Sequence, residues 1–380
     1  MEYVKLGEIA DLEMGKTPAR NNSRYWNGNN TWVSISDLKE KYIVESKEKI
    51  TDTAVSDTKI KEVPENTVIM SFKLSIGKKA ITTKKLYTNE AIIALNIKDK
   101  TKVDVEYLYY ALENVDFLRY TDKAAKGKTL NKEKLKKIKI PICSIKKQKE
   151  IVENLNIINV VINKQKEQLK NINELYKSLF YEMFGDPIRN EKGWEVKKLS
   201  EVSDIKSGGT PSTKNKEYWE NGDISWIGSN MCQNKVIYEN NGKFITQKGL
   251  ENSSAKVFEK DVILIALVGA TIGKVALLKF LTTTNQNIAG IKILDNKRYK
   301  SEYIFYILQF LYPKFQKLGG DKFKMANLSF IKNLMILDVS YTLQNKFAEK
   351  VEKIDKLKFE IEQSLKETEN LYNSLMQKFF

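Results

Sequence analysis

Histidine is absent from this sequence of 380 residues, which has two cysteines and six prolines. Without histidine, Ser-His-Asp and Cys-His catalysis, His-ligated zinc and imidazole acid-base chemistry are excluded, whereas carboxylate or lysine catalysis is not. Cys143 and Cys232 occupy unmatched positions in the two halves, so neither a disulfide framework nor a duplicated metal site is predicted. No apolar run reaches the roughly 18–20 residues that cross a bilayer, and the first residues lack a signal peptide's apolar stretch. We therefore expect a cytoplasmic protein without a membrane partner.

Motifs for nucleotides and for phosphodiester chemistry are also missing. Residues 269–275 (Gly-Ala-Thr-Ile-Gly-Lys-Val) resemble a phosphate loop, but only three residues separate the glycines, and Val275 stands where Ser or Thr would contact magnesium. No Gly-x-Gly-x-x-Gly fingerprint occurs. Asp37 with residues 45–47 (Glu-Ser-Lys) faintly matches a nuclease carboxylate-lysine set, but the second half does not repeat it. We expect no catalytic residue, no cofactor and no metal in this chain.

The sequence is internally duplicated. A first set of residues returns 193 positions later, and the offset drifts to 196 towards the end (Gly77 and Gly273, Gln148 and Gln344). The first copy comprises Leu6, Glu8, Asp11, Gly15, Thr17, Pro18, Tyr25 and Trp26, and the second Leu199, Glu201, Asp204, Gly208, Thr210, Pro211, Tyr218 and Trp219. A period of about half the chain indicates two homologous units rather than a solenoid, whose repeats run roughly 20–50 residues. Two similar heads on one chain can bind two similar sites.

Basic residues outnumber acidic ones in both halves. The chain has 64 Lys and Arg against 48 Asp and Glu, a net charge of +16. Two basic heads suit a polyanion that is bound at two places, such as double-stranded DNA. The alternative is a general bias towards lysine, which leaves a basic but merely soluble chain.

Each half ends in a long amphipathic helix, expected over residues 146–184 and 342–380. Apolar residues recur at alternating steps of four and three from position 151 to 183 and from 347 to 379, which is the 3.5-residue period of a coiled-coil seam. Helices of roughly 35–40 residues span about 55–60 Å. We expect them to pair antiparallel, with Gln165, Lys358 and Thr368 setting the register. Alternatively, each packs on its own head or mediates dimerisation.

The rest of each half is predicted to be a mixed, β-rich head. Strands are expected at 31–35, 67–72 and 91–97 in the first head and at 225–227, 261–267 and 289–294 in the second, with helices at 105–115 and 301–311. Trp32, Trp226, Tyr107 and Tyr303 are predicted core residues. The predicted fold is α+β, with two pseudo-symmetric heads (1–145 and 196–341) separated by an antiparallel coiled coil (146–184 and 342–380) and a linker at 185–195.

Polar loops are the candidate DNA-binding sites. Glycine, proline and Tyr-Trp frame a loop in each half, and its variable centre carries side chains that donate to phosphates and base edges. Further duplicated turns add basic and amide residues, although each could be an ordinary solvated loop. The candidates in the first head are Lys16, Thr17, Arg20, Asn21, Asn22, Ser23, Arg24, Lys73, Ser75, Lys78, Lys79, Asn89, Lys126 and Lys128. Those in the second are Thr210, Ser212, Thr213, Lys214, Asn215, Lys216, Thr271, Lys274, Asn285, Gln286, Lys322 and Lys324.

The order of these motifs, duplicated around two coils, resembles the specificity (S) subunit of type I restriction-modification systems over the whole length. The motifs are residues 208–212, 218–219, 224–227, 261–264, 269–273, 284–286, 138–141 leading to Gln148, 183–187 and 193–194. The resemblance implies two target recognition domains that each read a few base pairs, joined by helices that act as a ruler. It also implies two modification (M) subunits that bind S-adenosylmethionine and methylate adenine, and restriction (R) subunits that use ATP and Mg²⁺.

The first head departs from the second at a few positions of these motifs. Lys16 stands where the second head has Gly209, and Glu90 where it has Gln286. Three alternatives remain beside a non-catalytic specificity subunit: an enzyme acting on nucleic acid by itself, a coiled-coil adaptor that binds only proteins, and the specificity part of a related methyltransferase with a different nuclease.

Overall fold

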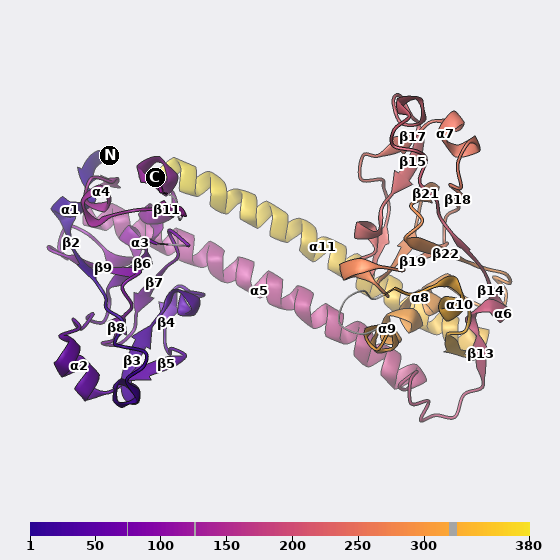
Figure 1. Cartoon of the computed structure of the whole chain (residues 1–380), viewed down its shortest axis with the longest axis horizontal. Coiled ribbons are helices and arrows are strands. Elements are labelled where there is room, and N and C mark those ends of the chain that lie inside the picture. Colours follow the sequence, from indigo (N-terminus) through magenta and orange to yellow (C-terminus); the bar gives the residue numbers. More distant parts are fainter. Residues whose placement is uncertain (74, 125–126, 319–324) are drawn as a thin grey trace. The chain divides into compact units, whose positions relative to one another are not determined.

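The two halves of the chain fold into similar successions of strands and helices. The computed structural model describes residues 1–73, 75–124, 127–318 and 325–380. They form two compact units, Met1–Lys166 with Gln363–Phe380, and Glu167–Glu362, so each unit holds one head and segments of both long helices. The helices are α5 (Ile145–Phe184) and α11 (Tyr341–Phe379), drawn in pink and yellow in Figure 1.

The head of the first unit is built on a five-stranded sheet in the order β2-β9-β6-β7-β4 and a three-stranded sheet in the order β5-β3-β8 (Figure 1). Its strands are β1 (Glu2–Lys5), β2 (Ala10–Met14), β3 (Trp26–Val33), β4 (Tyr42–Ile43), β5 (Glu48–Ile50), β6 (Val68–Ser71), β7 (Lys79–Thr82), β8 (Tyr87–Thr88), β9 (Ile92–Ile97), β10 (Asp122–Ala124), β11 (Gly127–Thr129) and β12 (Lys139–Ile142). Its helices are α1 (Leu6–Ile9), α2 (Asp52–Thr58), α3 (Val105–Glu113) and α4 (Lys132–Lys136).

The second unit repeats this plan with a five-stranded sheet in the order β14-β22-β19-β20-β16 and a four-stranded sheet in the order β17-β15-β21-β18. Its strands are β13 (Val196–Lys198), β14 (Ser203–Ser207), β15 (Ile224–Ile227), β16 (Lys235–Ile237), β17 (Phe244–Ile245), β18 (Val257–Phe258), β19 (Ile263–Ala266), β20 (Val275–Leu278), β21 (Thr282–Thr284), β22 (Ile288–Ile293) and β23 (Met335–Leu337). Its helices are α6 (Leu199–Val202), α7 (Gln247–Glu251), α8 (Ser301–Phe310), α9 (Tyr312–Gln316) and α10 (Leu328–Lys332).

Both faces of each five-stranded sheet are buried. In the first head, alternate residues of β6, such as Val68 and Met70, face the apolar side of α3, while Ile69 faces a second cluster with Val33 and Leu86. The predicted core aromatics Trp32, Trp226, Tyr107 and Tyr303 are all buried, which confirms that prediction. The predicted mixed fold is likewise confirmed.

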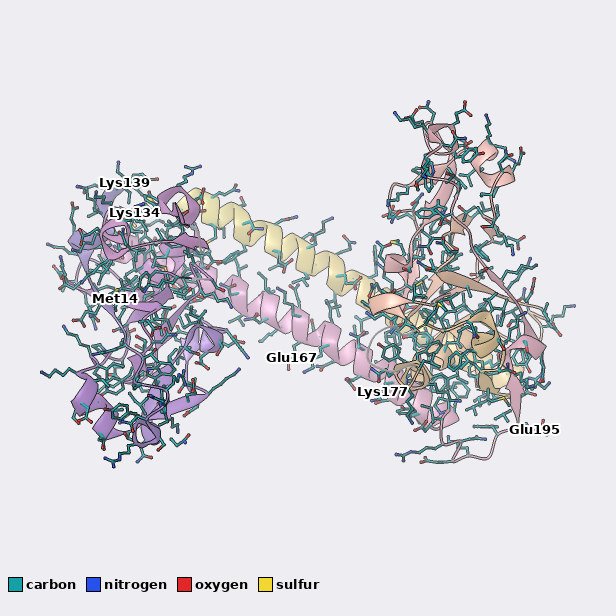
Figure 2. The ribbon with its side chains drawn as sticks, in the orientation of Figure 1. Met14, Lys134, Lys139, Glu167, Lys177 and Glu195 are labelled. Atoms are coloured by element: carbon teal, nitrogen blue, oxygen red, sulfur yellow. The ribbon has the colours of Figure 1, made fainter. Side chains whose placement is uncertain are left out.

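The predicted seams of the long helices are confirmed. Every seam position of α5 and of α11 is buried or half-buried. In the first unit, Gln165 Nε2 on α5 donates to Ser364 Oγ on α11 at 2.8 Å, and in the second unit Tyr176 on α5 donates to Asp355 on α11. Glu167 and Lys177 project from α5 as exposed side chains (Figure 2). Gly185, with φ +81°, ends α5 in the left-handed conformation that glycine adopts without strain.

The last segment of α11 completes the core of the first unit. Met376 is buried in the cluster that contains α3 and β9, and the ring of Phe380 lies 5.2 Å from that of Tyr107. Glutamine residues at matching positions of the two long helices bind the segment before the core helix of each head. The amide of Gln148 bonds Asp104 N and Lys102 O, and Gln344 makes the same pair of bonds at the start of α8. The part of the chain that the structure describes contains no helix with the length and apolarity of a membrane span.

Candidate nucleic-acid interface

The candidate loops of the first head meet at one end of its five-stranded sheet. β2 and β6 both run antiparallel to β9, so their last residues, Met14 and Ser71, lie beside its first residues. Met14 is labelled in Figure 2. Gly15 N donates to Ile92 O at 3.2 Å and Phe72 N to Ala91 O at 3.0 Å, so the framed loop, the β6–β7 hairpin and the turn before β9 emerge together. We call this the loop end of the sheet.

The second head has an equivalent loop end. β14 and β19 end beside the start of β22, with Gly208 N bonded to Ile288 O at 3.0 Å and Leu267 N to Asn287 O at 2.8 Å. Ala326 N also donates to Leu267 O at 2.8 Å, which brings the segment before α10 to the same place. Sheet topology therefore gathers the framed loop, the hairpin and the turn in each head, and the segment before α10 joins them in the second head.

Two tryptophans hold each framed loop. In the first head, the indole of Trp26 donates to Ala19 O at 3.2 Å and that of Trp32 to Lys16 O at 3.1 Å. Trp219 and Trp226 bond Ser212 O and Gly209 O in the same way, both at 3.2 Å. The rings of each pair meet edge to face, at 5.1 and 5.2 Å between centroids. The loop backbone is thus fixed by its frame, and the side chains at its centre are free to differ.

A glycine at the start of each loop permits this close approach. A Cβ built on Gly15 would overlap Thr88 and the carbonyl oxygen of Asn89, and one on Gly208 would overlap Thr284 and the carbonyl oxygen of Asn285. Neither glycine has a positive φ, so the backbone conformation does not require glycine here. Glycine is needed because the loop packs closely against the turn.

Arg20 is the most constrained candidate of the first loop. Its guanidinium forms an ion pair with Glu48 and lies 4.0 Å from the ring centroid of Trp26 and 5.0 Å from that of Trp32. Hydrogen bonding to Glu48 is the main cause of the raised pKa of Arg20. The side chain remains exposed, so the carboxylate and the rings orient its charge without covering it.

The remaining candidates of the first loop are mostly solvent-facing. Asn21, Ser23 and Arg24 are exposed, while Asn22 caps a short 3-10 helix (Ser23–Tyr25) by accepting from Arg24 N. Lys16 Nζ donates to Thr58 O at 2.7 Å, which directs it towards the end of α2. Exposed polar groups in this arrangement can donate to phosphates or bases.

The second loop has a similar surface with different side chains. Ser212, Thr213 and Lys214 are exposed, and Asn215 caps the 3-10 helix Lys216–Tyr218 as Asn22 does in the first head. Lys216 makes an exposed ion pair with Glu220 at 3.7 Å, which leaves its charge accessible because such pairs are weak in water.

The hairpin lysines differ in their surroundings. Lys78 and Ser75 are exposed and Lys73 is half-buried, at the loop end. The side chain of Lys79 is 10% exposed, lies 4.6 Å from the ring centroid of Tyr109 and 3.4 Å from Glu113. Burial lowers the pKa of Lys79. These contacts direct Lys79 towards α3, so they favour a role in packing over one in DNA contact.

In the second head, Lys274 and Thr271 occupy the corresponding hairpin. Lys274 Nζ donates to Gln233 Oε1 at 3.0 Å, and both hairpin residues are half-buried. Four further candidates cannot be placed: Lys126, Lys322 and Lys324 lie outside the described residues, as does the side chain of Lys128.

The turns before β9 and β22 carry the contacts that the sequence did not reveal. Thr17 Oγ1 donates to the carboxylate of Glu90, and Thr210 Oγ1 to the amide oxygen of Gln286. Asn89 and Asn285 stabilise these turns by accepting from the backbone two residues ahead, both at 3.1 Å. Glu90 and Glu48 thus bring two carboxylates to the candidate residues of the first head, through contacts with Thr17 and Arg20.

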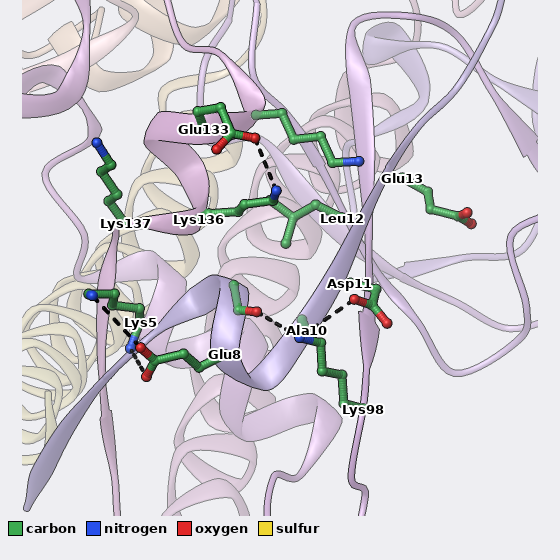
Figure 3. A pocket seen from close by; sticks show the side chains of 12 residues that line it. Lys5, Glu8, Ala10, Asp11, Leu12, Glu13, Lys98, Glu133, Lys136 and Lys137 are labelled. Atoms are coloured by element: carbon green, nitrogen blue, oxygen red, sulfur yellow. Dashed lines mark hydrogen bonds and ion pairs between the residues drawn. The ribbon is translucent and has the colours of Figure 1, made fainter.

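A separate hollow lies between α1, β2 and α4 (Figure 3). Its five lysines face four carboxylates, and Lys98 pairs with Asp11 at 3.6 Å and Lys136 with Glu133 at 3.0 Å. Lys5 also pairs with Glu8, so three of the five lysines are bound to carboxylates of the same hollow, and its mixed charge does not favour an anion. Within the described ranges, no group of three or more His, Cys, Asp or Glu is placed to hold a metal ion.

Comparison with known proteins adds an independent line of evidence. A family model described as "Type I restriction modification DNA specificity domain" matches residues 1–174 and again 191–369. The specificity subunit of the type I restriction enzyme MjaIX from Methanocaldococcus jannaschii is 25% identical over 372 residues, covering 91% of this chain and 84% of that protein. The EcoR124I/EcoR124II specificity subunit of Escherichia coli is 26% identical over 216 residues, covering 55% of this chain and 52% of that protein.

Solved structures share the fold. The S subunit of a type I restriction-modification system from M. genitalium superposes with a TM-score of 0.62 at 17% identity, covering 100% of this chain and 96% of that one. A structure from a study of complex assembly and conformational transition of the type I R-M system gives 0.61 at 18% identity, covering 99% and 96%.

Proposed function

The chain belongs to the type I restriction-modification DNA specificity family, and from this premise we propose that each of its two heads reads one half of a bipartite, asymmetric DNA sequence. The observation that carries the proposal is the duplicated loop end, where three segments meet on a shared backbone frame. Frame contacts are equal in the two heads, while Arg20 is replaced by Thr213 and Glu90 by Gln286. Equal frames with unequal side chains suit two heads that bind the same polymer and select different bases.

Affinity and selectivity have different sources in this proposal. Exposed lysines and arginines such as Arg24 and Lys214 contact phosphates, so binding weakens as salt rises. The polar side chains at the loop ends contact base edges in the major groove and supply the selectivity. The paired helices α5 and α11 set the gap between the two half-sites.

Two modification subunits are proposed as partners, one for each unit. Val161 on α5 and Leu371 on α11 are exposed in the first unit, and Leu357 on α11 and Leu175 on α5, their equivalents at an offset of 196, are exposed in the second. Each unit therefore offers an equivalent pair of exposed apolar side chains on its helix segments, as expected for two copies of one partner. Leu371→Glu or Leu175→Glu should each reduce the number of bound modification subunits from two to one, measured by native mass spectrometry.

The chain itself is proposed to be non-catalytic. Its relatives are named as specificity subunits. We assign catalysis to partner subunits that bind S-adenosylmethionine for methylation and ATP with Mg²⁺ for restriction. If purified chain methylated or cut DNA alone, this part of the proposal would be wrong.

Exchange of one head tests the proposal. Residues 1–145 are replaced by those of a relative with a different specificity, and methylated adenines are mapped in cells that also make the modification subunit. We expect one half of the methylated sequence to change and the other to remain. A change in both halves would contradict independent heads. Arg24→Ala and Lys214→Ala distinguish the alternative of a protein-only adaptor, which predicts unchanged DNA affinity.

A further inference from the structure

Residues 90 and 286 hold the same position in the two heads but differ in chemistry. We propose that Glu90, together with Arg20, reads a G·C base pair in the half-site of the first head, and that Gln286 reads an A·T pair in that of the second. This inference rests on the proposed function, since it names the bases that two of the recognition residues select.

The frame around both residues is the same. Asn89 N donates to Val33 O at 3.0 Å and Asn285 N to Ile227 O at 3.2 Å. Each turn is therefore fixed to the strand that carries the second tryptophan of the frame, Trp32 or Trp226. The asparagine side chain then closes the turn, and the loop threonine bonds the side chain at position 90 or 286. Both side chains are exposed at the loop end. The two heads therefore present a carboxylate and an amide at the same position of a common backbone frame.

A carboxylate can form hydrogen bonds with few groups on the base edges. It only accepts hydrogen bonds, and Thr17 uses one of the two oxygens of Glu90. In the major groove, Asp and Glu accept from the N4 amino group of cytosine. A phosphate would repel Glu90, so a position at the edge of the DNA backbone does not suit it.

Arg20 supplies the complementary donor. The guanidinium of Arg20 lies 5.0 Å from the ring centroid of Trp32, and Asn89, next to Glu90, donates its backbone N–H to the carbonyl oxygen of the following residue, Val33. Arg20 and Glu90 are therefore both held against the end of β3. The raised pKa of Arg20 agrees with this, because its hydrogen bond to Glu48 is the main cause and the charge of Glu90 adds to it. Nη1 and Nη2 of Arg20 each donate one hydrogen bond to Glu48, which leaves three of the five N–H groups of the guanidinium for other acceptors. Arginine uses two such donors to bind O6 and N7 of guanine. Arg20 and Glu90 together thus present donors and an acceptor that match the two bases of one G·C pair.

The second head lacks this pair of charges. Thr213 stands in the place of Arg20, and the amide of Gln286 both accepts and donates. Thr210 donates to the amide oxygen of Gln286, and the second lone pair of that oxygen can accept from a base. The same bond fixes the orientation of the amide group and so of its nitrogen. Glutamine bonds N6 and N7 of adenine in this manner.

The test selects DNA from a pool of duplexes with randomised half-sites, using the full chain assembled with its modification subunits. Glu90→Gln keeps an acceptor for Thr17, so the frame is retained. We expect the preference for G·C over A·T at one position of one half-site to fall by about tenfold or more, with the other half-site unchanged. Gln286→Glu should make the reciprocal change in the other half-site.

Glu133→Gln is the matched control, because it removes the same charge from an exposed residue of the same unit on α4. It should leave both half-sites unchanged. If Glu90→Gln selects the same sequences as the unmodified chain, or shifts them no more than Glu133→Gln does, the inference is wrong. If the unmodified chain selects no bipartite sequence, the proposed function itself fails and this inference with it.

Discussion

Replacement of Phe347 by alanine should loosen the second unit at the place where α5 and α11 meet under the head. Phe347, near the start of α11, is 0% exposed. Its ring lies 5.6 Å from that of Phe180 and 5.2 Å from that of Phe184 on α5, and 5.4 Å from that of Tyr306 on α8. One side chain therefore links three helices of this unit.

The expected loss of stability follows from the buried volume. Truncation of a fully buried phenylalanine to alanine costs about 3–5 kcal/mol, because apolar contacts are lost and a cavity remains. Phe359 on the same helix is 61% exposed and serves as the matched control. Phe359→Ala should change the free energy of unfolding by no more than about 0.5 kcal/mol. Because both substitutions raise the helix propensity of α11 equally, their difference isolates the packing contribution.

Hydrogen exchange measured by mass spectrometry during urea unfolding separates the two units. In Phe347→Ala, peptides from α8 and from the first turns of α11 should lose protection at lower urea than in the unmodified chain, while peptides from β6 and β9 should be unaffected. Equal unfolding curves for Phe347→Ala and Phe359→Ala would refute the assignment of this aromatic cluster as the support of the second head.

Three further predictions concern the loop, the helix contact and the helix length. Gly208→Ala places a Cβ against Thr284, and should reduce selection at the second half-site while costing about 1–3 kcal/mol of stability, measured by DNA selection and urea unfolding. Burial raises the pKa of Asp355 despite its bond from a tyrosine, so the acid holds its proton to higher pH in the native state than when unfolded. The contribution of Asp355 to stability is thus fully present below its unfolded pKa of about 3.9 and is lost as the pH rises through the higher native pKa. Between pH 4 and pH 8, the urea midpoint should therefore fall less in Asp355→Asn than in the unmodified chain. One heptad inserted into both α5 and α11 adds about 10 Å of helix and should widen the gap between half-sites by about three base pairs without changing their bases, as methylation mapping would show; an unchanged gap would oppose the ruler.

The architecture was accessible from the sequence because local patterns specify it. The strand predicted at 91–97 is observed as β9 (Ile92–Ile97), and the helix predicted at 146–184 as α5 (Ile145–Phe184). Duplication supplied two instances of each signal, and the seam of the coil follows from a period that any helix must obey. These features depend on residues a few positions apart.

The interface was less accessible because its contacts span long stretches of sequence. The sequence predicts Arg20 as a DNA-binding candidate but does not reveal its ion pair with Glu48, 28 positions away. The sequence predicts Lys79 as a DNA-binding candidate beside Lys78, although the alternation of β7 directs its side chain onto Tyr109 of α3. Glu90 was noted as a departure between the heads, but its bond to Thr17 across 73 positions requires the sheet topology. The duplicated Asn-Glu and Asn-Gln turns were the signal that could have identified it.

The division of the chain into units has a consequence for synthesis on the ribosome. The second unit is continuous, Glu167–Glu362, whereas the first also needs Gln363–Phe380, whose Met376 lies in its core. Translation therefore delivers every residue of the later head's unit before the earlier head receives its final helical segment. A released chain that ends at residue 362 should contain a complete second unit and an incomplete first one. The head that is encoded first is therefore the last to be completed.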